Sequence, residues 1–372
     1  MKKVLIIPGA LHVGGAERVA RDIGVNADPE KYEIHYLVFG KKIEVYESDV
    51  EAAGCRVLRM DSPSSGYWRY FRALMSLIRA EHYDVIHSHT MFNSGWVMLA
   101  GKLCGVPVRI THSHSIRGFE KRNLLKNTYE KIMRRVILAF ATELVACGRD
   151  AGEWLYGKKA FDRRGRLIYN GIALDSYAYD KAAGHEIRRK YGLEDSFVIG
   201  HVGHLAQVKN QIFLIRLLPE LLKARPETRL LLLGEGLDRP MLTDQVEALG
   251  LQEAVTFTGN VDNVGAFMSA MDVFAFPSLY EGMPLALMEA QANGLPCLIS
   301  DKIPSDAVVT DQAVSLPLEP EVWKKALLNA KRNLSANSFE QIRQLGLDTA
   351  DMLKKIYALY EADPNGNETD NR

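Results

Sequence analysis

Two glutamates separated by seven residues lie in the stretch SLYEGMPLALMEAQANG. The apolar run MDVFAFP comes directly before it and is typical of a buried strand. Pro284 suits a first helical position, and good helix formers follow as far as Gly294, a residue that fits just past a helix end. We therefore predict a strand, a turn that carries Glu281, and a helix that carries Glu289 about one and a half turns past Pro284.

The start of this helix is a natural binding site for phosphate, because its first backbone N–H groups have no helical partners and carry partial positive charge. The expected donors are the N–H groups of Gly282, Met283 and Leu285, since the intervening proline has none. A carboxylate beside phosphate would repel it, so Glu281 is expected to face a neutral, hydroxyl-rich part of the ligand. Glu289 is placed to accept hydrogen bonds from a ribose diol.

Other candidate residues follow other predicted strands. Lys209 lies in QVKN, just before a helical pattern, and Gly14 and Gly15 come after the strand VLIIP and open a helix. The two glycines allow close backbone approach, but they do not form G-x-G-x-x-G and do not indicate a dinucleotide. His112 and His114 in THSHS are two apart on a strand, so they share one face.

A second histidine cluster, HSHT, ends the preceding predicted strand. Two such clusters suggest a metal ion, but no carboxylate or thiol completes an obvious ligand set, so we predict no metal site. The four cysteines are scattered without a C-x-x-C pair, which favours free thiols in a reducing compartment.

Strand-like apolar runs alternate with helical patterns along most of the chain and restart at FVIGHVG. This alternation predicts an α/β protein with two doubly wound parallel-sheet domains, in which ligands bind at the carboxyl ends of the strands, facing an inter-domain cleft. We place an N-terminal domain at 1–175, a C-terminal domain at 176–350, a helix at 351–362 that packs back toward the N-terminal domain, and a disordered tail at 363–372.

The composition, with 47% hydrophobic and 25% charged residues among 372, is that of a soluble globular protein. The formal net charge of zero argues against nucleic acid as a partner. Residues 1–180 hold 27 Lys and Arg against 20 Asp and Glu, which leaves 19 and 26 of the 46 of each kind for the remainder. The two halves are therefore expected to face different partners.

Eight basic residues between Arg109 and Arg135 accompany apolar side chains such as Leu124 and Ile132. This mixture fits peripheral contact with an anionic membrane, although a core-packing helix with a solvated basic face has the same pattern. No apolar run approaches the roughly 20 residues of a membrane span, and the N-terminus lacks the apolar core of a signal peptide. We expect a cytoplasmic protein, peripheral at the inner face of the cytoplasmic membrane.

The segment PSLYEGMPLALMEAQANGLPCLISD resembles the E-x7-E segment of family 4 retaining glycosyltransferases, which have the GT-B fold. Further segments resemble that family in the expected order, especially its capsule and exopolysaccharide branch: GGAERVA, YNGIALDSY, GHVGHLAQVKNQIFLI, LLLGEG and VTFTGNVDNV. The resemblance implies transfer of a sugar from a nucleoside-diphosphate donor, uridine by family frequency, to a hydroxyl of a glycan or lipid-linked acceptor. It also implies retention of configuration without a metal or cofactor.

Carried over to this chain, the resemblance implies that Glu281 orients the donor sugar, Glu289 binds the ribose and Lys209 neutralises the diphosphate. A histidine in THSHS would lie by the reactive carbon, with His112 and His114 both eligible and His114 preferred. The remaining implied donor-binding positions are Gly14, Gly15, His204, Glu235, Gly282, Met283 and Leu285.

The chain departs from the family at His204, where the family usually has arginine. Histidine is shorter and cannot replace a bidentate guanidinium, so donor affinity is expected to depend more on Lys209. Two alternatives stay open. One is a non-catalytic nucleotide-sugar-binding subunit, which the presence of Glu281 and Glu289 disfavours; the other is a different GT-B enzyme, such as a nucleotide-sugar epimerase.

Overall fold

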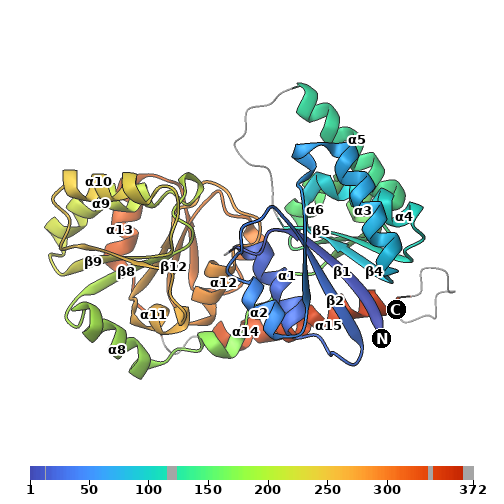
Figure 1. Cartoon of the computed structure of the whole chain (residues 1–372). Helices are drawn as coiled ribbons and strands as arrows, with labels where there is room; N and C mark the ends of the chain where they lie inside the picture. The colour runs from blue at the N-terminus through green and yellow to red at the C-terminus, as the bar shows by residue number, and fades with distance from the viewer. Residues whose placement is uncertain (13, 115–123, 334–337, 363–372) are drawn as a thin grey trace. The chain divides into compact units, whose positions relative to one another are not determined.

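The computed structural model describes residues 1–12, 14–114, 124–333 and 338–362, in two compact units (Figure 1). The first unit comprises Met1–Asn170 together with the chain from Asp351 onward, and the second comprises Gly171–Ala350. Residues 171–175, assigned to the first domain from sequence, therefore belong to the second unit. The predicted tail at 363–372 lies outside the described residues.

The first unit is built on seven parallel strands in the order β3-β2-β1-β4-β5-β6-β7. They are β1 (Lys2–Gly9), β2 (Tyr32–Phe39), β3 (Arg56–Met60), β4 (Val85–Ser88), β5 (Val108–Ser113), β6 (Glu143–Ala146) and β7 (Gly165–Leu167). The order reverses between β1 and β4, which makes this sheet doubly wound, as predicted.

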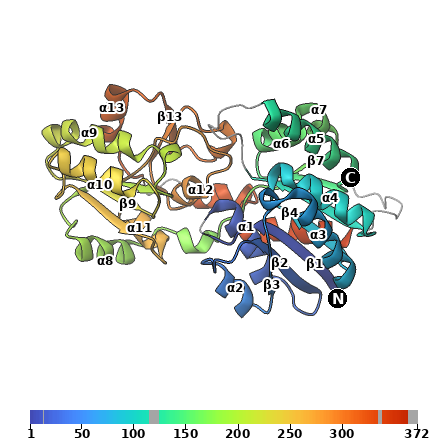
Figure 2. The same ribbon diagram turned by 45° about the horizontal axis from the view of Figure 1, so that its top comes forward.

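Helices cover both faces of this sheet (Figure 2). Leu5 and Ile7 of β1 pack with α3, α4 and α5, whereas Val4 and Ile6 pack with α1 and α15. Burial on both faces explains why β1 is apolar throughout. The helices are α1 (Gly15–Val25), α2 (Glu47–Ala52), α3 (Tyr67–Glu81), α4 (Ser94–Leu103), α5 (Leu124–Phe140), α6 (Arg149–Tyr156), α7 (Lys158–Arg164) and α15 (Thr349–Glu361).

The second unit repeats this architecture with six parallel strands in the order β10-β9-β8-β11-β12-β13. The strands are β8 (Phe197–Val202), β9 (Thr228–Leu233), β10 (Val255–Gly259), β11 (Val273–Phe276), β12 (Cys297–Ser300) and β13 (Ala313–Leu316). The helices are α8 (Lys181–Tyr191), α9 (Gln211–Ala224), α10 (Arg239–Ala248), α11 (Val264–Ala270), α12 (Leu285–Ala292), α13 (Pro320–Asn329) and α14 (Ser338–Gln344). The order reverses between β8 and β11.

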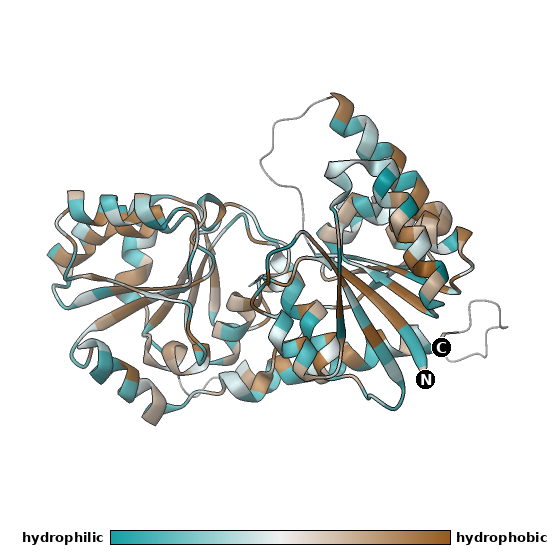
Figure 3. Cartoon of the chain, viewed as in Figure 1, coloured by the Kyte–Doolittle hydropathy of each residue, from teal (hydrophilic) through white to brown (hydrophobic). Residues whose placement is uncertain are grey.

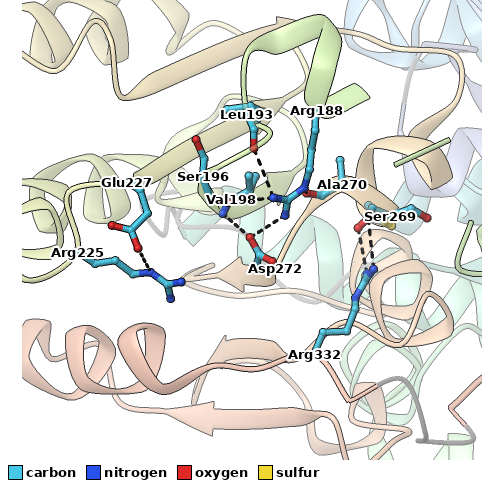
Figure 4. A network of polar contacts seen from close by, with 11 residues as sticks. Arg188, Leu193, Ser196, Val198, Arg225, Glu227, Ser269, Ala270, Asp272 and Arg332 are labelled. Atoms are coloured by element: carbon cyan, nitrogen blue, oxygen red, sulfur yellow. Dashed lines mark hydrogen bonds and ion pairs between the residues drawn. The ribbon is translucent and has the colours of Figure 1, made fainter. Parts of the chain in front are cut away.

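A polar network secures the amino ends of β8 and β11 (Figure 4). Arg188 of α8 donates to Asp272 Oδ2 at 2.8 Å and to the Ser196 carbonyl at 2.9 Å. The same carboxylate accepts from the Val198 N–H at 2.7 Å. Each of these groups has a hydrogen-bond partner, which indicates a structural role for the amino end of this sheet.

Figure 3 shows that the strands of both sheets are largely hydrophobic, while the outer helices carry hydrophilic and hydrophobic residues together. This distribution fits hydrophobic clusters on both faces of the first sheet and a further cluster in the second unit. In the described part of the chain, no helix combines the length and apolar character needed to cross a membrane.

Candidate functional site

The loops after β8 and β11 lie at the carboxyl edge of the second sheet, where its strand order reverses. Crossovers leave these adjacent strands in opposite directions, which opens the crevice in which such sheets bind ligands. Two hydrogen bonds join the loops: the Leu279 N–H donates to the Val208 carbonyl at 2.8 Å, and Asn210 Nδ2 donates to the Pro277 carbonyl at 3.1 Å. The fold therefore places Lys209 next to Glu281.

Lys209 and Glu281 form an ion pair, with 2.6 Å between Nζ and Oε1. Their side chains are only 18% and 12% exposed, and the Lys209 ammonium also lies 5.0 Å from the centre of the Phe276 ring. Sequence reasoning selected both residues but did not foresee the pair. The pair is electrically balanced, so an incoming anion would compete with Glu281 for Lys209.

The helix after Glu281 begins one residue later than predicted. Pro284 has an extended ψ of 109° and caps the helix, so that Leu285 is its first residue. Glu289 is on this helix as expected and is only 3% exposed, an unusual burial for a carboxylate. Gly294 has a positive φ of 70° just past the helix end, which confirms its predicted role.

Two glycines bring the loop after β9 against the loop after β8. A Cβ atom at Gly234 or at Gly236 would overlap the carbonyl oxygen of Gly203 or of Leu205, respectively. This close approach is the physical reason for the glycines of LLLGEG. Between them, Glu235 is exposed and its carboxylate lies 3.2 Å from Arg239 Nη1.

His204 lies in the same loop as Lys209, and its side chain is exposed. Its carbonyl oxygen accepts a hydrogen bond from Gln211 Nε2 at 3.0 Å. The same amide nitrogen lies 3.2 Å from Nε2 of His201, a buried histidine that sequence reasoning missed. Burial lowers the pKa of His201 to about 4, so its ring is neutral at pH 7.

In the first unit, Gly14 caps α1 and Gly15 begins it, as predicted. A Cβ atom at Gly14 would overlap the Glu17 carboxylate, so the glycine makes room for this acid. Burial raises the pKa of the Glu17 carboxyl, and His12 Nε2 lies 3.7 Å from it. Glu17 is a further candidate residue that sequence reasoning did not select.

His112 ends up beside His114 at the carboxyl end of β5, with ring centres 4.0 Å apart, as expected for positions two apart. The HSHT segment joins them: His89 Nδ1 lies 2.7 Å from His114 Nε2, and His87 stacks on His112. Burial lowers the pKa of His114 to about 4. The structure thus combines two histidine clusters that were treated separately in the sequence.

Part of the basic segment between Arg109 and Arg135 lies outside the described residues, namely Arg117, Lys121 and Arg122. In the described part, Leu124 and Leu125 of α5 are 80% and 78% exposed. α5 buries Met133 and Ile137 and also exposes large apolar side chains, so both interpretations of the basic segment stay open.

Comparison with known proteins identifies two family models. The model described as Glycosyltransferase Family 4 matches residues 13–176, and the model described as Glycosyl transferases group 1 matches residues 184–338. The two matches fall on the two units of the structure.

Several relatives carry similar names. The chain is 33% identical to the putative glycosyltransferase EpsF of Bacillus subtilis, covering 96% of each chain. It is 26% identical to the capsular polysaccharide biosynthesis glycosyltransferase CapH of Staphylococcus aureus, over 96% of this chain and 99% of CapH. It is 28% identical to an Escherichia coli UDP-Gal:alpha-D-GlcNAc-diphosphoundecaprenol alpha-1,3-galactosyltransferase, over 62% of this chain and 60% of that enzyme.

Among solved structures, the crystal structure of Anabaena HepE in complex with UDP has a TM-score of 0.78 at 20% identity, covering 96% of this chain and 99% of HepE. At this identity the likeness shows the fold. With the two family models and EpsF, it establishes that the chain belongs to the family 4-type glycosyltransferases of the GT-B fold.

Proposed function

We propose that this glycosyltransferase uses a UDP-sugar donor and transfers the sugar, with retention of configuration, to a hydroxyl group of a glycan or lipid-linked acceptor in surface polysaccharide synthesis. The names of its relatives support this pathway class, since CapH is a capsular polysaccharide enzyme and the galactosyltransferase acts on a diphosphoundecaprenol-linked sugar. The UDP-sugar assignment rests on that enzyme's UDP-Gal donor and on the UDP complex of HepE.

The observation that carries the proposal is the balanced ion pair at the carboxyl edge of the second sheet. A diphosphate that enters this crevice carries more negative charge than one carboxylate, so it attracts Lys209 away from Glu281. Glu281 is then free to accept hydrogen bonds from donor-sugar hydroxyls. The amides of Gly282, Met283 and Leu285 and the carboxylate of Glu289 complete the site, for phosphate and ribose respectively.

Charge on the leaving nucleoside diphosphate grows in the transition state, and Lys209 together with the start of α12 would stabilise it. In this proposal these groups replace a metal ion at the diphosphate. His204 supplies no guanidinium, so Lys209 carries more of the donor affinity. The leaving phosphate deprotonates the acceptor hydroxyl on the same face, which gives retention without a protein nucleophile.

In the first unit, His114, or else His112, would contact the donor sugar near its reactive carbon. Gly14 and Gly15 would allow the backbone to approach the donor. The half-buried carboxyl of Glu17 lies directly behind Gly14, and burial raises its pKa.

We propose that the first unit, which would bind the acceptor, contacts the inner face of the cytoplasmic membrane peripherally. Leu124, Leu125 and Ile132 of α5 are large exposed apolar residues that lie among Lys126 and Lys131. This combination suits anionic headgroups and would bring the first unit to a lipid-linked acceptor.

A transfer assay tests the proposal. UDP-glucose, UDP-galactose and their N-acetyl derivatives are incubated with a diphosphoundecaprenol-linked acceptor, and the new linkage is assigned by proton NMR. We expect an α linkage from an α-linked UDP-sugar, at unchanged rate when magnesium is omitted. A β linkage contradicts retention, and transfer only from GDP- or ADP-sugars contradicts the assignment of the base.

A further inference from the structure

Four histidines from two neighbouring strand ends form one buried cluster in the first unit. His87 is in β4 and His112 in β5, and His89 and His114 follow those strands. The ring centres of His87 and His89 are 4.3 Å apart, and those of His89 and His112 are 5.2 Å apart. All four are buried, with exposures between 0% and 8%.

Only some of the ring nitrogens in this cluster have hydrogen-bond partners among the described residues. His87 Nδ1 lies 2.8 Å from the Tyr360 hydroxyl of α15, and His89 Nδ1 lies 2.7 Å from His114 Nε2. In contrast, Nε2 of His87, Nε2 of His89 and both ring nitrogens of His112 have no hydrogen-bond partner among the described residues. An unsatisfied buried polar atom costs about 1–3 kcal/mol, so a ligand or a bound water that contacts these nitrogens would stabilise the folded chain.

We propose that His87, His89 and His112 bind a divalent transition-metal ion of the zinc class. One ring nitrogen of each residue lies within 4.8 Å of the other two. Three nitrogens around a tetrahedral zinc ion are about 3.4 Å apart, given bonds of about 2.1 Å. Ring rotations that bring these nitrogens up to about 1.4 Å closer together would complete the site, with a fourth position for water.

The chemistry of the donors selects the metal. Imidazole nitrogen suits zinc, copper, nickel or iron, whereas magnesium and calcium require oxygen ligands. Metal-binding histidine is neutral, and the burial of His87, His89 and His112 disfavours the charged form of each ring.

The hydrogen bonds also match those of known metal-ligating histidines, whose second ring nitrogen is held by an outer partner. Tyr360 has this position for His87, and His114 has it for His89. An ion on His89 Nε2 fixes the proton on Nδ1, which then donates to His114 Nε2. The ion would thereby set the tautomer of His114. This tautomer matters for sugar transfer only if His114 contacts the donor sugar, which rests on the proposed function. Ion binding itself does not depend on that function.

Metal titration of the untagged full chain, stripped with a chelator, tests this proposal. Cobalt is followed by visible absorption and zinc by calorimetry. We expect one ion per chain, and a loss of affinity of about tenfold or more in His89→Gln and in His112→Gln. Tyr360→Phe should weaken the ion by about tenfold, as outer-shell substitutions do.

His185→Gln is the matched control, because His185 lies exposed on α8 in the other unit. Circular dichroism and UDP binding show whether each variant is folded, and they keep a failure of the metal site distinct from a failure of the proposed donor site. If His112→Gln does not fold, His89→Gln decides. Absence of ion binding in the wild type, or equal affinity in folded His89→Gln, overturns the proposal.

Discussion

The two sheets have the same strand order up to their edges, yet the chemistry beside their reversal points differs. In the first sheet, β4 and β5 end in four buried histidines with several unpartnered nitrogens among the described residues. In the second, the loops after β8 and β11 carry Lys209 and Glu281, which neutralise each other. The same strand order thus positions a cluster of buried histidines in one unit and an ion pair between Lys209 and Glu281 in the other.

Removing the carboxylate from the balanced pair should have the largest effect. In Glu281→Gln, the donor-sugar hydroxyls lose a charged acceptor, and we expect transfer to fall by about 100-fold or more. The rate of UDP release with saturating acceptor measures this. Glu247→Gln, an exposed acid on α10 of the same unit, is the control and should keep the wild-type rate. Unchanged turnover in Glu281→Gln would contradict the proposed role.

At the amino end of the same sheet, the charged groups have a structural role. Arg188→Met leaves the Asp272 carboxylate without its guanidinium partner. The pair is partly exposed, so we expect a loss of about 2 kcal/mol in the free energy of unfolding, less than for a fully buried pair. Urea unfolding measures the loss. UDP affinity of the folded variant should not change, and a large change would link this network to the donor site.

The pH dependence of stability distinguishes buried neutral histidines from the ion pair. The pKa of His201 is about 4 in the folded chain, against an ordinary value of 6.5. As the pH falls, this histidine is protonated in the unfolded chain before it is protonated in the folded chain. The contribution of neutral His201 to the free energy of unfolding is therefore present above pH 6.5 and is lost as the pH falls toward 4. Between pH 7.5 and 5.5 the free energy of unfolding decreases by about 1.4 kcal/mol.

Urea unfolding of wild type and His201→Asn at both pH values isolates this contribution. The variant should show the smaller decrease, since it lacks the titrating ring. An equal decrease in both proteins would mean that His201 is not the group responsible.

The smallest effect on stability is expected at α5, where Leu124→Asp replaces an exposed side chain. The free energy of unfolding should change by less than about 0.5 kcal/mol. The fraction of the protein that sediments with vesicles rich in phosphatidylglycerol should nevertheless be several-fold lower for Leu124→Asp than for the wild type. Leu237→Asp, at a residue that is 92% exposed in the second unit, is the control. Equal loss in both variants would contradict a specific membrane surface on α5.

The central strands were predictable from sequence, but several edge strands were not. β1, β8, β9 and β11 are buried on both faces and are therefore continuous apolar runs. β3, β7 and β13 lie at or near sheet edges and are largely exposed, so RVLRM, GRL and AVSL lack that signal. Their place depends on a neighbouring strand that offers hydrogen bonds, which local pattern does not encode.

The site shows the same limit. The types of Lys209, Glu281 and Glu289, and their place at strand ends, followed from local pattern and family resemblance. Their partners did not, because they depend on long-range packing. Lys209 meets Glu281 across 72 positions of chain, and His87 meets Tyr360 across 273. The histidines of HSHT and THSHS likewise meet only because β4 pairs with β5, a pairing that the local pattern does not encode.

Calorimetric titration of UDP, without magnesium, into wild type and Lys209→Ala tests whether Lys209 binds the diphosphate of the donor. Lys223→Ala, an exposed lysine on α9, is the matched control. We expect UDP to bind the wild type and the control equally, and to bind Lys209→Ala at least about tenfold more weakly, because the diphosphate loses its cation. Equal UDP affinity in Lys209→Ala, or binding that requires magnesium, would contradict it.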